Sequence, residues 1–260
     1  MHAVRHRLPS IWVVLPTFNE AENIESISTA ILEAVPSATL LVADDASPDG
    51  TGDIADRIAA DDDRVRVLHR AGKEGLGPAY RAGFRHALEE GAQVVVQMDA
   101  DFSHDPRRLP DLLRPIVDGP CDLVIGSRYV AGGRVEDWGF ARRVISRGGG
   151  LFSRLVLAIP VHDLTGGFKA WSREALLGAL SSDTGPGGYA FQIEMTYRAH
   201  RGHARIREVP ITFVDRRLGT SKMSGRIVAE ALTVVLGLRI RDVLTRLHRP
   251  RLPVGGSRLP

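Results

Sequence analysis

The stretch Val94-Val95-Val96-Gln97-Met98-Asp99-Ala100-Asp101 decides the fold, because a short apolar run leads directly into two carboxylates. The run predicts a buried strand, and aspartates at positions i and i+2 of an extended backbone project from the same side. Two such carboxylates repel each other unless a cation binds between them. Mg²⁺ or Mn²⁺ in such a site normally carries phosphate oxygens on its open positions. A solvated turn after a strand is the alternative interpretation of an isolated Asp-x-Asp pair.

On both sides of this run, short apolar segments alternate with amphipathic ones through the first 125 residues. Unbroken apolar runs suit a parallel sheet that is covered on both faces. The alternation predicts right-handed βαβ units and hence a doubly wound α/β domain. The predicted strands are 11–15, 39–43, 65–69, 94–98 and 123–125. The predicted helices are 21–35, with Asn19 as its cap, 52–60, 77–90 and 106–118.

The second half of the chain has a less regular pattern. Its predicted elements are helices over 141–157, 191–201 and 225–247 and a short strand over 211–214. The expected domains are a basic N-terminal tail over 1–10, one α/β domain over 11–224, an amphipathic C-terminal helix over 225–249 and a proline-rich tail over 250–260.

The composition excludes several classes of protein. With 260 residues and 43% hydrophobic content, the chain buries one sizeable core. Its single cysteine, Cys121, excludes an internal disulfide and a zinc site of several thiolates. No apolar stretch reaches the ~18 residues of a membrane span, and no signal-peptide h-region follows the basic start of the chain. The net charge of +3 does not indicate a nucleic-acid partner.

Polar motifs in the first half follow predicted strands. Segments 16–20, 44–51 and 126–129 follow the first, second and fifth strands, as the aspartate pair follows the fourth. Ligands of doubly wound sheets bind beyond these carboxyl ends, so we expect the segments to meet there. The chain has neither a P-loop nor a dinucleotide-binding glycine motif. A basic segment over 216–222 and the planar guanidinium of Arg128 offer cations for phosphates. Acids for a metal and bases for phosphates describe a site that stabilises a nucleotide-diphosphate leaving group.

With these motifs placed, the sequence resembles the polyprenyl-phosphate mannosyltransferases, also called dolichol-phosphate mannose synthases, from Ile11 to about Ala231. These are inverting GT-A glycosyltransferases of family 2. The resemblance is carried by segments 16–20, 44–51, 99–104, 126–129, 188–192 and 209–222. It implies a GT-A fold and transfer of mannose from GDP-mannose to a polyprenyl monophosphate, which gives polyprenyl-phosphate mannose and GDP. The implied cofactor is Mg²⁺ or Mn²⁺.

The resemblance also implies roles for individual residues. The implied donor-binding residues are Pro16, Phe18, Glu20, Ala43, Asp45, Asp99, Ala100, Asp101, Arg128, Arg216 and Lys222. Asp101 is the implied metal ligand. The implied catalytic residues are Asp99, Asp101 and Arg128, and the implied acceptor-phosphate residues are Arg128, Arg142 and Ser146. The chain departs from the family at Phe18, where relatives often have Tyr, and at Ser103, where some relatives have a metal-binding Gln.

Two alternatives remain open at the level of the sequence. The first is the same fold acting on UDP-glucose to make polyprenyl-phosphate glucose, because sugar and base selectivity depend on few contacts. The second is a non-catalytic domain that binds a nucleotide sugar. The complete set of Asp99, Asp101, Arg128, Arg216 and Lys222 argues against the second alternative.

The sequence of the predicted C-terminal helix indicates how the protein contacts its lipid partner. An apolar stripe at helical spacing, followed by arginines, favours contact with an anionic membrane surface. The stripe consists of Ile227, Ala231, Leu232, Val235, Leu238 and Leu244. We therefore expect a peripheral protein on the cytoplasmic face of a membrane. The alternatives are that the stripe packs on the protein's own core, and that a separate membrane-anchoring subunit brings the protein to its acceptor.

Overall fold

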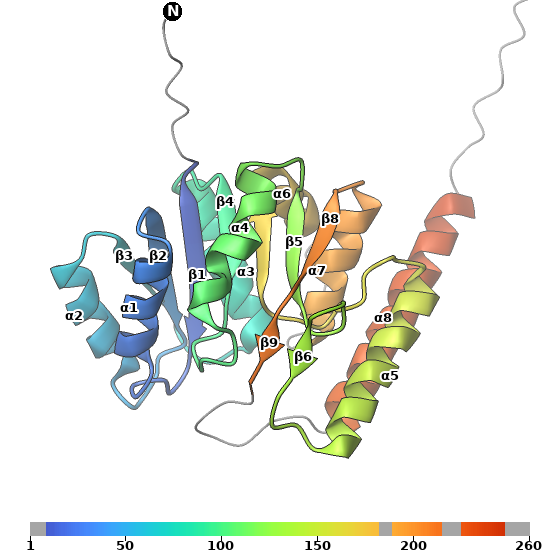
Figure 1. Cartoon of the computed structure of the whole chain (residues 1–260), viewed down its shortest axis with the longest axis horizontal. Helices are drawn as coiled ribbons and strands as arrows, with labels where there is room; N and C mark the ends of the chain where they lie inside the picture. The colour runs from blue at the N-terminus through green and yellow to red at the C-terminus, as the bar shows by residue number, and fades with distance from the viewer. Residues whose placement is uncertain (1–8, 182–188, 215–224, 248–260) are drawn as a thin grey trace, which may run out of the picture.

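One central sheet brings the strand ends together in the computed structural model (Figure 1). The structure describes residues 9–181, 189–214 and 225–247, so the predicted terminal tails fall almost entirely outside the described residues. The strand order of the seven-stranded sheet is β3-β2-β1-β4-β7-β5-β8. The strands span Ile11–Thr17 (β1), Ala38–Asp44 (β2), Val65–His69 (β3), Val94–Gln97 (β4), Leu123–Ser127 (β5), Lys169–Ser172 (β7) and Ile206–Pro210 (β8).

Most neighbouring strands in this sheet are parallel. β1 pairs with β2 and β4, β2 pairs with β3, and β5 pairs with β8, all in parallel. The exception is β7, which lies antiparallel between β4 and β5. The predicted doubly wound, mostly parallel sheet is therefore confirmed, with one strand of opposite direction inserted between its two parallel parts.

Helices cover both faces of the sheet (Figure 1). One face carries α1 (Ile24–Ala34), α2 (Thr51–Asp61) and α4 (Leu109–Val117), the last preceded by a 3₁₀ turn over Pro106–Arg108. The other face carries α3 (Leu76–Glu89), α6 (Arg173–Leu180) and α7 (Tyr189–Arg201). The remaining long helices, α5 (Phe140–Leu157) and α8 (Gly225–Leu247), lie side by side at the end of the molecule next to α7.

The alternation of side chains along β1 divides the core into two layers. Val13 packs with Ile27 of α1 on one face, and Val14 packs with Phe84 of α3 on the other. Gly83 allows α3 to lie close to the sheet, because a Cβ at this position would lie 2.4 Å from Cγ1 of Val14. Burial of each large apolar side chain stabilises the fold by about 1.5–3 kcal/mol, which fixes the strand ends on which the site depends.

The first helix starts later than the sequence predicts. It begins at Ile24 rather than at residue 21, and Asn19 is not its cap. Asn19 has a φ of 60°, in the left-handed region, and the residue at the N-cap of the helix is Asn23. The carbonyl of Glu20 instead accepts hydrogen bonds from the amides of Asn23 and Ile24, each at 2.9 Å, in a turn before the helix. The loop after β1 is therefore longer than predicted.

The second half contains elements that the sequence did not predict. These are β7, β8, α6 and the short β6 (Arg134–Val135). The predicted short strand over 211–214 corresponds to β9, which covers Thr212–Phe213 after β8 ends at Pro210. Pro210 has no N–H, so it favours the end of a strand. β9 leaves the main sheet and pairs in parallel with β6.

The C-terminal helix α8 has the bounds that the sequence predicts. In the predicted apolar stripe, Val235 is buried and Leu238 packs against the same part of the core, whereas Leu244 is exposed. The side chains of Ile227 and Ala231 are outside the described part of the chain. The stripe therefore serves the protein's own core in its middle part, which is the alternative interpretation. Within the described ranges, no helix has the length and apolar character that crossing a membrane requires.

Candidate active site

The loops after β1 and β2 are fixed against each other at the carboxyl edge of the sheet. Thr17 Oγ1 donates a hydrogen bond of 2.8 Å to Oδ1 of the buried Asp44. The amide and hydroxyl of Ser47 donate to the same carboxylate at 2.9 and 2.6 Å. The Ser47 hydroxyl in turn accepts from the Asn19 amide at 3.1 Å. These contacts hold the two loops that carry the predicted donor-binding residues Phe18, Glu20 and Asp45.

Further predicted donor-binding residues lie at these strand ends. Pro16 and Ala43 are register partners in neighbouring strands. Glu20 is fixed through its backbone amide, which donates to Oγ1 of Thr51 at 2.9 Å. The two strand ends and their loops therefore form a continuous surface.

Two cations that the sequence analysis missed lie in this surface. Nζ of Lys73 lies 3.6 Å from the ring centroid of Phe18, a cation–π contact. The guanidinium of Arg70 pairs with the buried carboxylate of Asp45 and, at 2.6 Å, with Glu74. Burial raises the pKa of Asp45, although Arg70 opposes the rise. The glycine-rich segment 72–77, which carries Lys73, was the available signal in the sequence.

The Asp-Ala-Asp turn follows β4, and each carboxylate is held by an uncharged donor. The phenol of Tyr80, on α3, donates a hydrogen bond of 2.8 Å to Oδ1 of Asp99. The Ser103 amide donates to Oδ1 of Asp101 at 3.1 Å. Between these two residues the chain passes through Phe102, whose φ of 57° is left-handed. The carboxylate positions are thus fixed by hydrogen bonds within and beside the turn.

These two carboxylates fit a divalent cation that is shared with phosphates. Gly167 leaves room beside Asp99, because a Cβ there would lie 3.2 Å from its Oδ2. The described residues contain no group of three or more His, Cys, Asp or Glu side chains that could hold a metal alone. Mg²⁺ keeps several water ligands and binds through one or two carboxylates plus substrate phosphates. The oxygen-only donors therefore suit Mg²⁺ or Mn²⁺.

Arg128, predicted as a phosphate contact, is bound to a buried carboxylate. Its Nε and Nη2 donate to Asp163 at 2.7 and 2.6 Å, and Nη2 also donates to Oγ1 of Thr165 at 2.8 Å. Both charged side chains are buried. Burial acts to raise the pKa of Asp163, but the Arg128 guanidinium outweighs it and holds that pKa below its ordinary value. Asp163 was missed because it lies 35 residues from its partner.

The predicted acceptor-phosphate residues lie close together around two aromatic rings. The hydroxyl groups of Tyr129 and Ser146 are 2.6 Å apart. The guanidinium carbon of Arg142 lies 4.0 Å from the ring centroid of Trp138, and that of Arg128 lies 5.6 Å from the same centroid. The structure therefore brings Arg128, Arg142 and Ser146 into one cluster.

A row of rings joins this cluster to the Asp-Ala-Asp turn. Phe213 of β9 meets Trp138 edge-on, with 5.5 Å between centroids, and meets His104 at 5.4 Å. His104 stacks on Phe168 at 5.1 Å, and burial lowers the pKa of its imidazole to about 4. The neutral ring therefore adds no positive charge beside Asp101 at neutral pH.

A buried polar network lies behind the aspartates. The ammonium of Lys169 donates to Oε1 of Gln192 at 3.1 Å and to Oγ1 of Thr196 at 2.8 Å. Nε2 of Gln97 donates to the same Gln192 oxygen at 2.8 Å and to the Gly167 carbonyl at 3.1 Å. Burial lowers the pKa of Lys169 to about 7. The network ties β4, β7 and α7 together, and none of its members was predicted.

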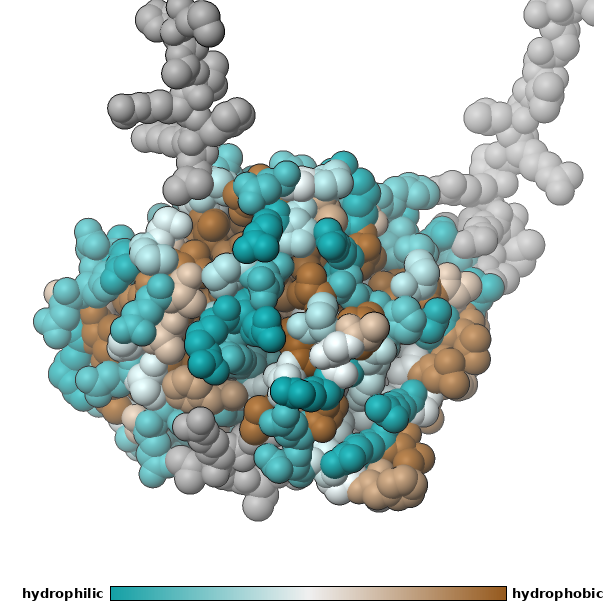
Figure 2. All heavy atoms as spheres, in the orientation of Figure 1, coloured by the Kyte–Doolittle hydropathy of each residue, from teal (hydrophilic) through white to brown (hydrophobic). Residues whose placement is uncertain are grey.

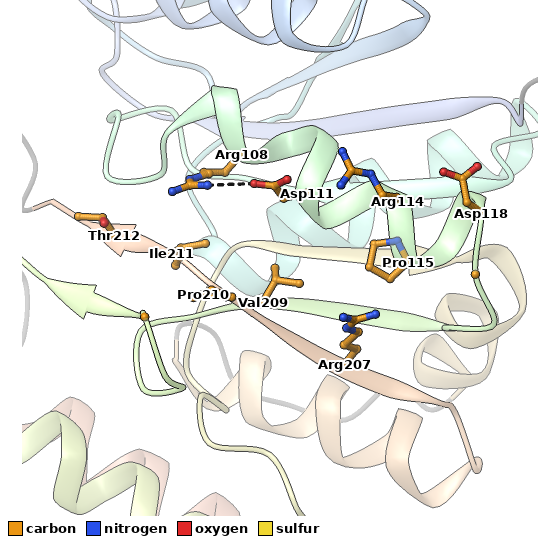
Figure 3. A pocket seen from close by; sticks show the side chains of 12 residues that line it. Arg108, Asp111, Arg114, Pro115, Asp118, Arg207, Val209, Pro210, Ile211 and Thr212 are labelled. Carbon is orange, nitrogen blue, oxygen red and sulfur yellow. Dashed lines mark hydrogen bonds and ion pairs between the residues drawn. The ribbon is translucent and has the colours of Figure 1, made fainter.

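A groove of about 520 Å³ adjoins the predicted acceptor-phosphate residues and is lined by Arg128, Tyr129, Arg147, Leu151 and Arg154. A second groove, of about 470 Å³, lies between α4 and β8, where Arg108 pairs with Asp111 at 3.0 Å (Figure 3). The second groove contains none of the predicted site residues. Two predicted phosphate contacts, Arg216 and Lys222, lie outside the described residues.

Comparison with known proteins shows the family. Residues 12–178 match the family described as Glycosyl transferase family 2. A curated relative, the undecaprenyl-phosphate mannosyltransferase of Micrococcus luteus, is 49% identical over 229 residues, which cover 86% of this chain and 92% of the relative. The polyprenol monophosphomannose synthase of Mycolicibacterium smegmatis is 48% identical over 235 residues, which cover 90% of this chain and 88% of the relative.

A solved structure with a similar fold is the glucosyl-3-phosphoglycerate synthase of Mycobacterium tuberculosis, in complex with Mn²⁺, UDP-glucose and phosphoglyceric acid. The TM-score is 0.66, and the similarity covers 89% of this chain and 80% of that chain. The sequence identity is 23%, so this likeness shows the fold alone.

Proposed function

The chain belongs to the polyprenyl-phosphate mannosyltransferases of glycosyltransferase family 2, and from this membership we propose that it moves mannose from GDP-mannose to a polyprenyl monophosphate. The predicted GT-A fold is confirmed. The observation that supports the proposed reaction is the position of the two predicted half-sites. The aspartate turn is linked to the cluster of Arg128, Arg142 and Ser146 by Phe213, whose ring lies 5.4 Å from His104 and 5.5 Å from Trp138.

The acceptor itself supplies the nucleophile in this reaction. The second pKa of a phosphate monoester is about 6, so the lipid phosphate is largely a dianion near pH 7. One of its oxygens attacks the anomeric carbon while the bond from that carbon to the diphosphate oxygen breaks on the opposite side. The sugar configuration inverts, and GDP leaves with the bonding electron pair. No proton has to be transferred, so no general base is required.

The protein then has two tasks, alignment of the acceptor anion and neutralisation of the leaving group. Arg142 and Ser146 would hold the acceptor phosphate. Asp101, with Asp99 beside it, would hold a divalent cation, which when bound neutralises charge on the departing diphosphate. Arg216 and Lys222 are proposed to contact the same diphosphate, as the family resemblance implies.

Arg128 is held in a fixed position within the proposed site. Its pairing with Asp163 and Thr165 orients the guanidinium before any substrate arrives. A fixed cation stabilises developing charge without reorganising during the reaction. We therefore propose that Arg128 contributes positive potential between the two half-sites, while Arg142, which is stacked on Trp138, contacts the acceptor phosphate directly.

We further propose that the protein works at an anionic membrane surface, bound through α5 and α8. The exposed large apolar side chains of these helices are Phe140, Val144, Ile145, Leu151, Leu155, Leu236, Ile240 and Leu244. Figure 2 shows hydrophobic side chains along the margin where α5 lies. Exposed Arg143 and Arg147 on α5 add positive charge suited to anionic headgroups.

This docking surface fits the proposed acceptor. Arg142 and Ser146 lie on α5 itself, so insertion of the apolar face of α5 brings the acceptor cluster to the level of lipid phosphates. The cytoplasmic face remains the predicted side of the membrane. An anchoring subunit is the alternative route to the same position, and vesicle binding by the purified chain distinguishes the two.

The reaction is tested by offering both nucleotide sugars to the purified chain. GDP-mannose and UDP-glucose are incubated in parallel with polyprenyl monophosphate and Mn²⁺ or Mg²⁺, and the lipid extract is analysed by mass spectrometry. The expected product is hexosyl lipid from GDP-mannose alone, and none in EDTA. Product from UDP-glucose alone would support the glucosyltransferase. Donor binding without any product, at all metal concentrations, would support the non-catalytic alternative.

A further inference from the structure

Trp138 lies between the two arginines of the acceptor cluster. Its side chain is buried in the segment between β6 and α5. The guanidinium carbon of Arg142 is 4.0 Å from the ring centroid, and that of Arg128 is 5.6 Å from it. Phe213 meets the ring at 73°, with 5.5 Å between centroids. An aromatic face attracts cations, so this ring holds two guanidinium groups near each other that would otherwise repel.

The indole N–H of Trp138 is a buried donor without an acceptor. Nε1 has no hydrogen-bond partner among the described residues. The contrast with Trp171 is direct, because the buried Nε1 of that residue donates to Oε1 of Gln97 at 3.1 Å. An indole N–H only donates, and leaving it unpaired in the interior costs free energy. A buried unpaired donor beside two cations is suited to an anion.

We propose that Trp138 belongs to the acceptor-phosphate site, with its ring positioning Arg142 and its N–H donating to an oxygen of a lipid phosphate monoester. This inference rests on the proposed function. Because Nε1 is buried, a neighbouring side chain must shift for the anion to reach it. Arg142 lies over the same ring and is the neighbour that an incoming anion attracts. Trp138 then supplies a neutral donor to an anion otherwise bound by cations and the hydroxyl of Ser146.

The first test separates the ring from the N–H by kinetics. Trp138→Phe keeps an aromatic face and removes the donor, whereas Trp138→Leu removes both. Loss of a hydrogen bond to a charged group is expected to raise the acceptor KM about tenfold in Trp138→Phe, and further in Trp138→Leu. The donor KM should change less than about twofold in Trp138→Phe, which keeps an aromatic ring beside Arg128. Trp12→Phe is the matched control, because Trp12 lies near the amino end of β1. This variant should retain the wild-type KM values for both acceptor and donor.

The second test observes the N–H itself. The chain has three tryptophans, so ¹⁵N-labelled protein gives three indole cross-peaks, of which the one missing in Trp138→Phe belongs to Trp138. Titration with a short-chain polyprenyl monophosphate should move this peak downfield, whereas the corresponding alcohol should leave it in place. Inorganic phosphate, in a third titration, shows whether the phosphate group alone is sufficient.

The outcomes separate this inference from the proposed function. An unchanged acceptor KM in Trp138→Phe, or an unmoved Trp138 peak in active protein saturated with the lipid phosphate, would overturn the inference and leave the mannosyltransferase intact. A moving peak in protein that transfers no sugar would support the anion site and contradict the proposed reaction.

Discussion

The phenol of Tyr80 and the carboxylate of Asp99 are joined by a hydrogen bond of 2.8 Å, which links helix α3 to the aspartate turn after β4. Tyr80 is fully buried and stacks on Phe84 with 5.5 Å between ring centroids. Burial and the neighbouring Asp99 raise the pKa of this phenol well above its ordinary value, so it remains a donor throughout the physiological pH range. Tyr80 is therefore a positioning residue for the predicted donor-binding carboxylate.

Tyr80→Phe should reduce kcat about tenfold without unfolding the protein, because it removes one hydrogen bond and keeps the ring stack. Steady-state kinetics and thermal melting on the same preparation check this expectation. The matched control is Phe84→Tyr, which adds a hydroxyl to the adjacent stacked ring instead of removing one. A Tyr80→Phe protein with wild-type kcat would show that Asp99 needs no orientation by this phenol.

Asp101→Asn should lower transfer to less than about a tenth of wild type, a change in barrier of more than about 1.4 kcal/mol. The substitution removes a metal-binding charge but little volume, and the Ser103 amide can still donate to the side-chain oxygen. GDP release is measured over a range of Mn²⁺ concentrations, with the melting temperature as the control for folding. Activity above that tenth at saturating Mn²⁺ would contradict the metal role.

Because its pKa is lowered, Lys169 should make the free energy of unfolding increase with pH in the alkaline range. Burial lowers its pKa to about 7, whereas a lysine in the unfolded chain titrates near 10.4. Between these values the unfolded state binds more protons than the native state, so the free energy of unfolding should rise as the pH increases from about 7 towards 10. Below pH 7 both states are protonated and this contribution stays constant.

Denaturant unfolding of wild type and Lys169→Met at a series of pH values checks this prediction. The variant removes the titrating group at similar length, so its stability should rise less over the alkaline range. Parallel curves for the two proteins would place the native pKa of Lys169 near its ordinary value, as the hydrogen bonds to Gln192 and Thr196 would favour.

Membrane binding should depend on α5. Phe140 and Leu155 are 82% and 71% exposed, so replacing both with serine removes apolar surface without opening the core. Flotation with anionic vesicles should show at least about a tenfold loss of partitioning, since burial of each such side chain contributes about 1.5–3 kcal/mol. Leu177→Ser on α6, where the wild-type side chain is 47% exposed, is the control at a distance from α5. Equal flotation of all three proteins would show that α5 does not carry the binding, and a wild-type chain that does not float would favour an anchoring subunit.

The part of the fold that could be predicted from the sequence is the part with local signals. The run from Val94 to Val96 is apolar, so both the strand and the aspartates after it were found. β7 was missed because it begins with Lys169 and ends with Ser172, and a buried lysine in a central strand does not read as apolar. Its burial depends on Gln192 and Thr196, which come more than 20 residues later.

The same distinction applies to the candidate site. Asp99, Asp101 and Arg128 follow predicted strands, and the positions of these strands in the sheet bring the residues to one edge. The partners Tyr80 and Asp163 could not be assigned, because nothing in the local sequence connects Tyr80 to Asp99 or Asp163 to Arg128. Trp138 was overlooked because its segment has no periodic pattern, and only the folded structure places it under Arg142.

The antiparallel strand β7 also has a consequence for the order in which the chain assembles on the ribosome. β1 to β4 pair only with one another and with β7, so their part of the sheet is available early in synthesis. β5 is synthesised next, but both of its sheet neighbours, β7 and β8, come later in the chain. Gly126 and Ser127 must therefore remain unpaired in a nascent chain that already carries a largely complete donor half. A chain that ends at Gly166 should show protease-resistant β1 to β4 and a cleavable β5, which would make the acceptor half the last to form.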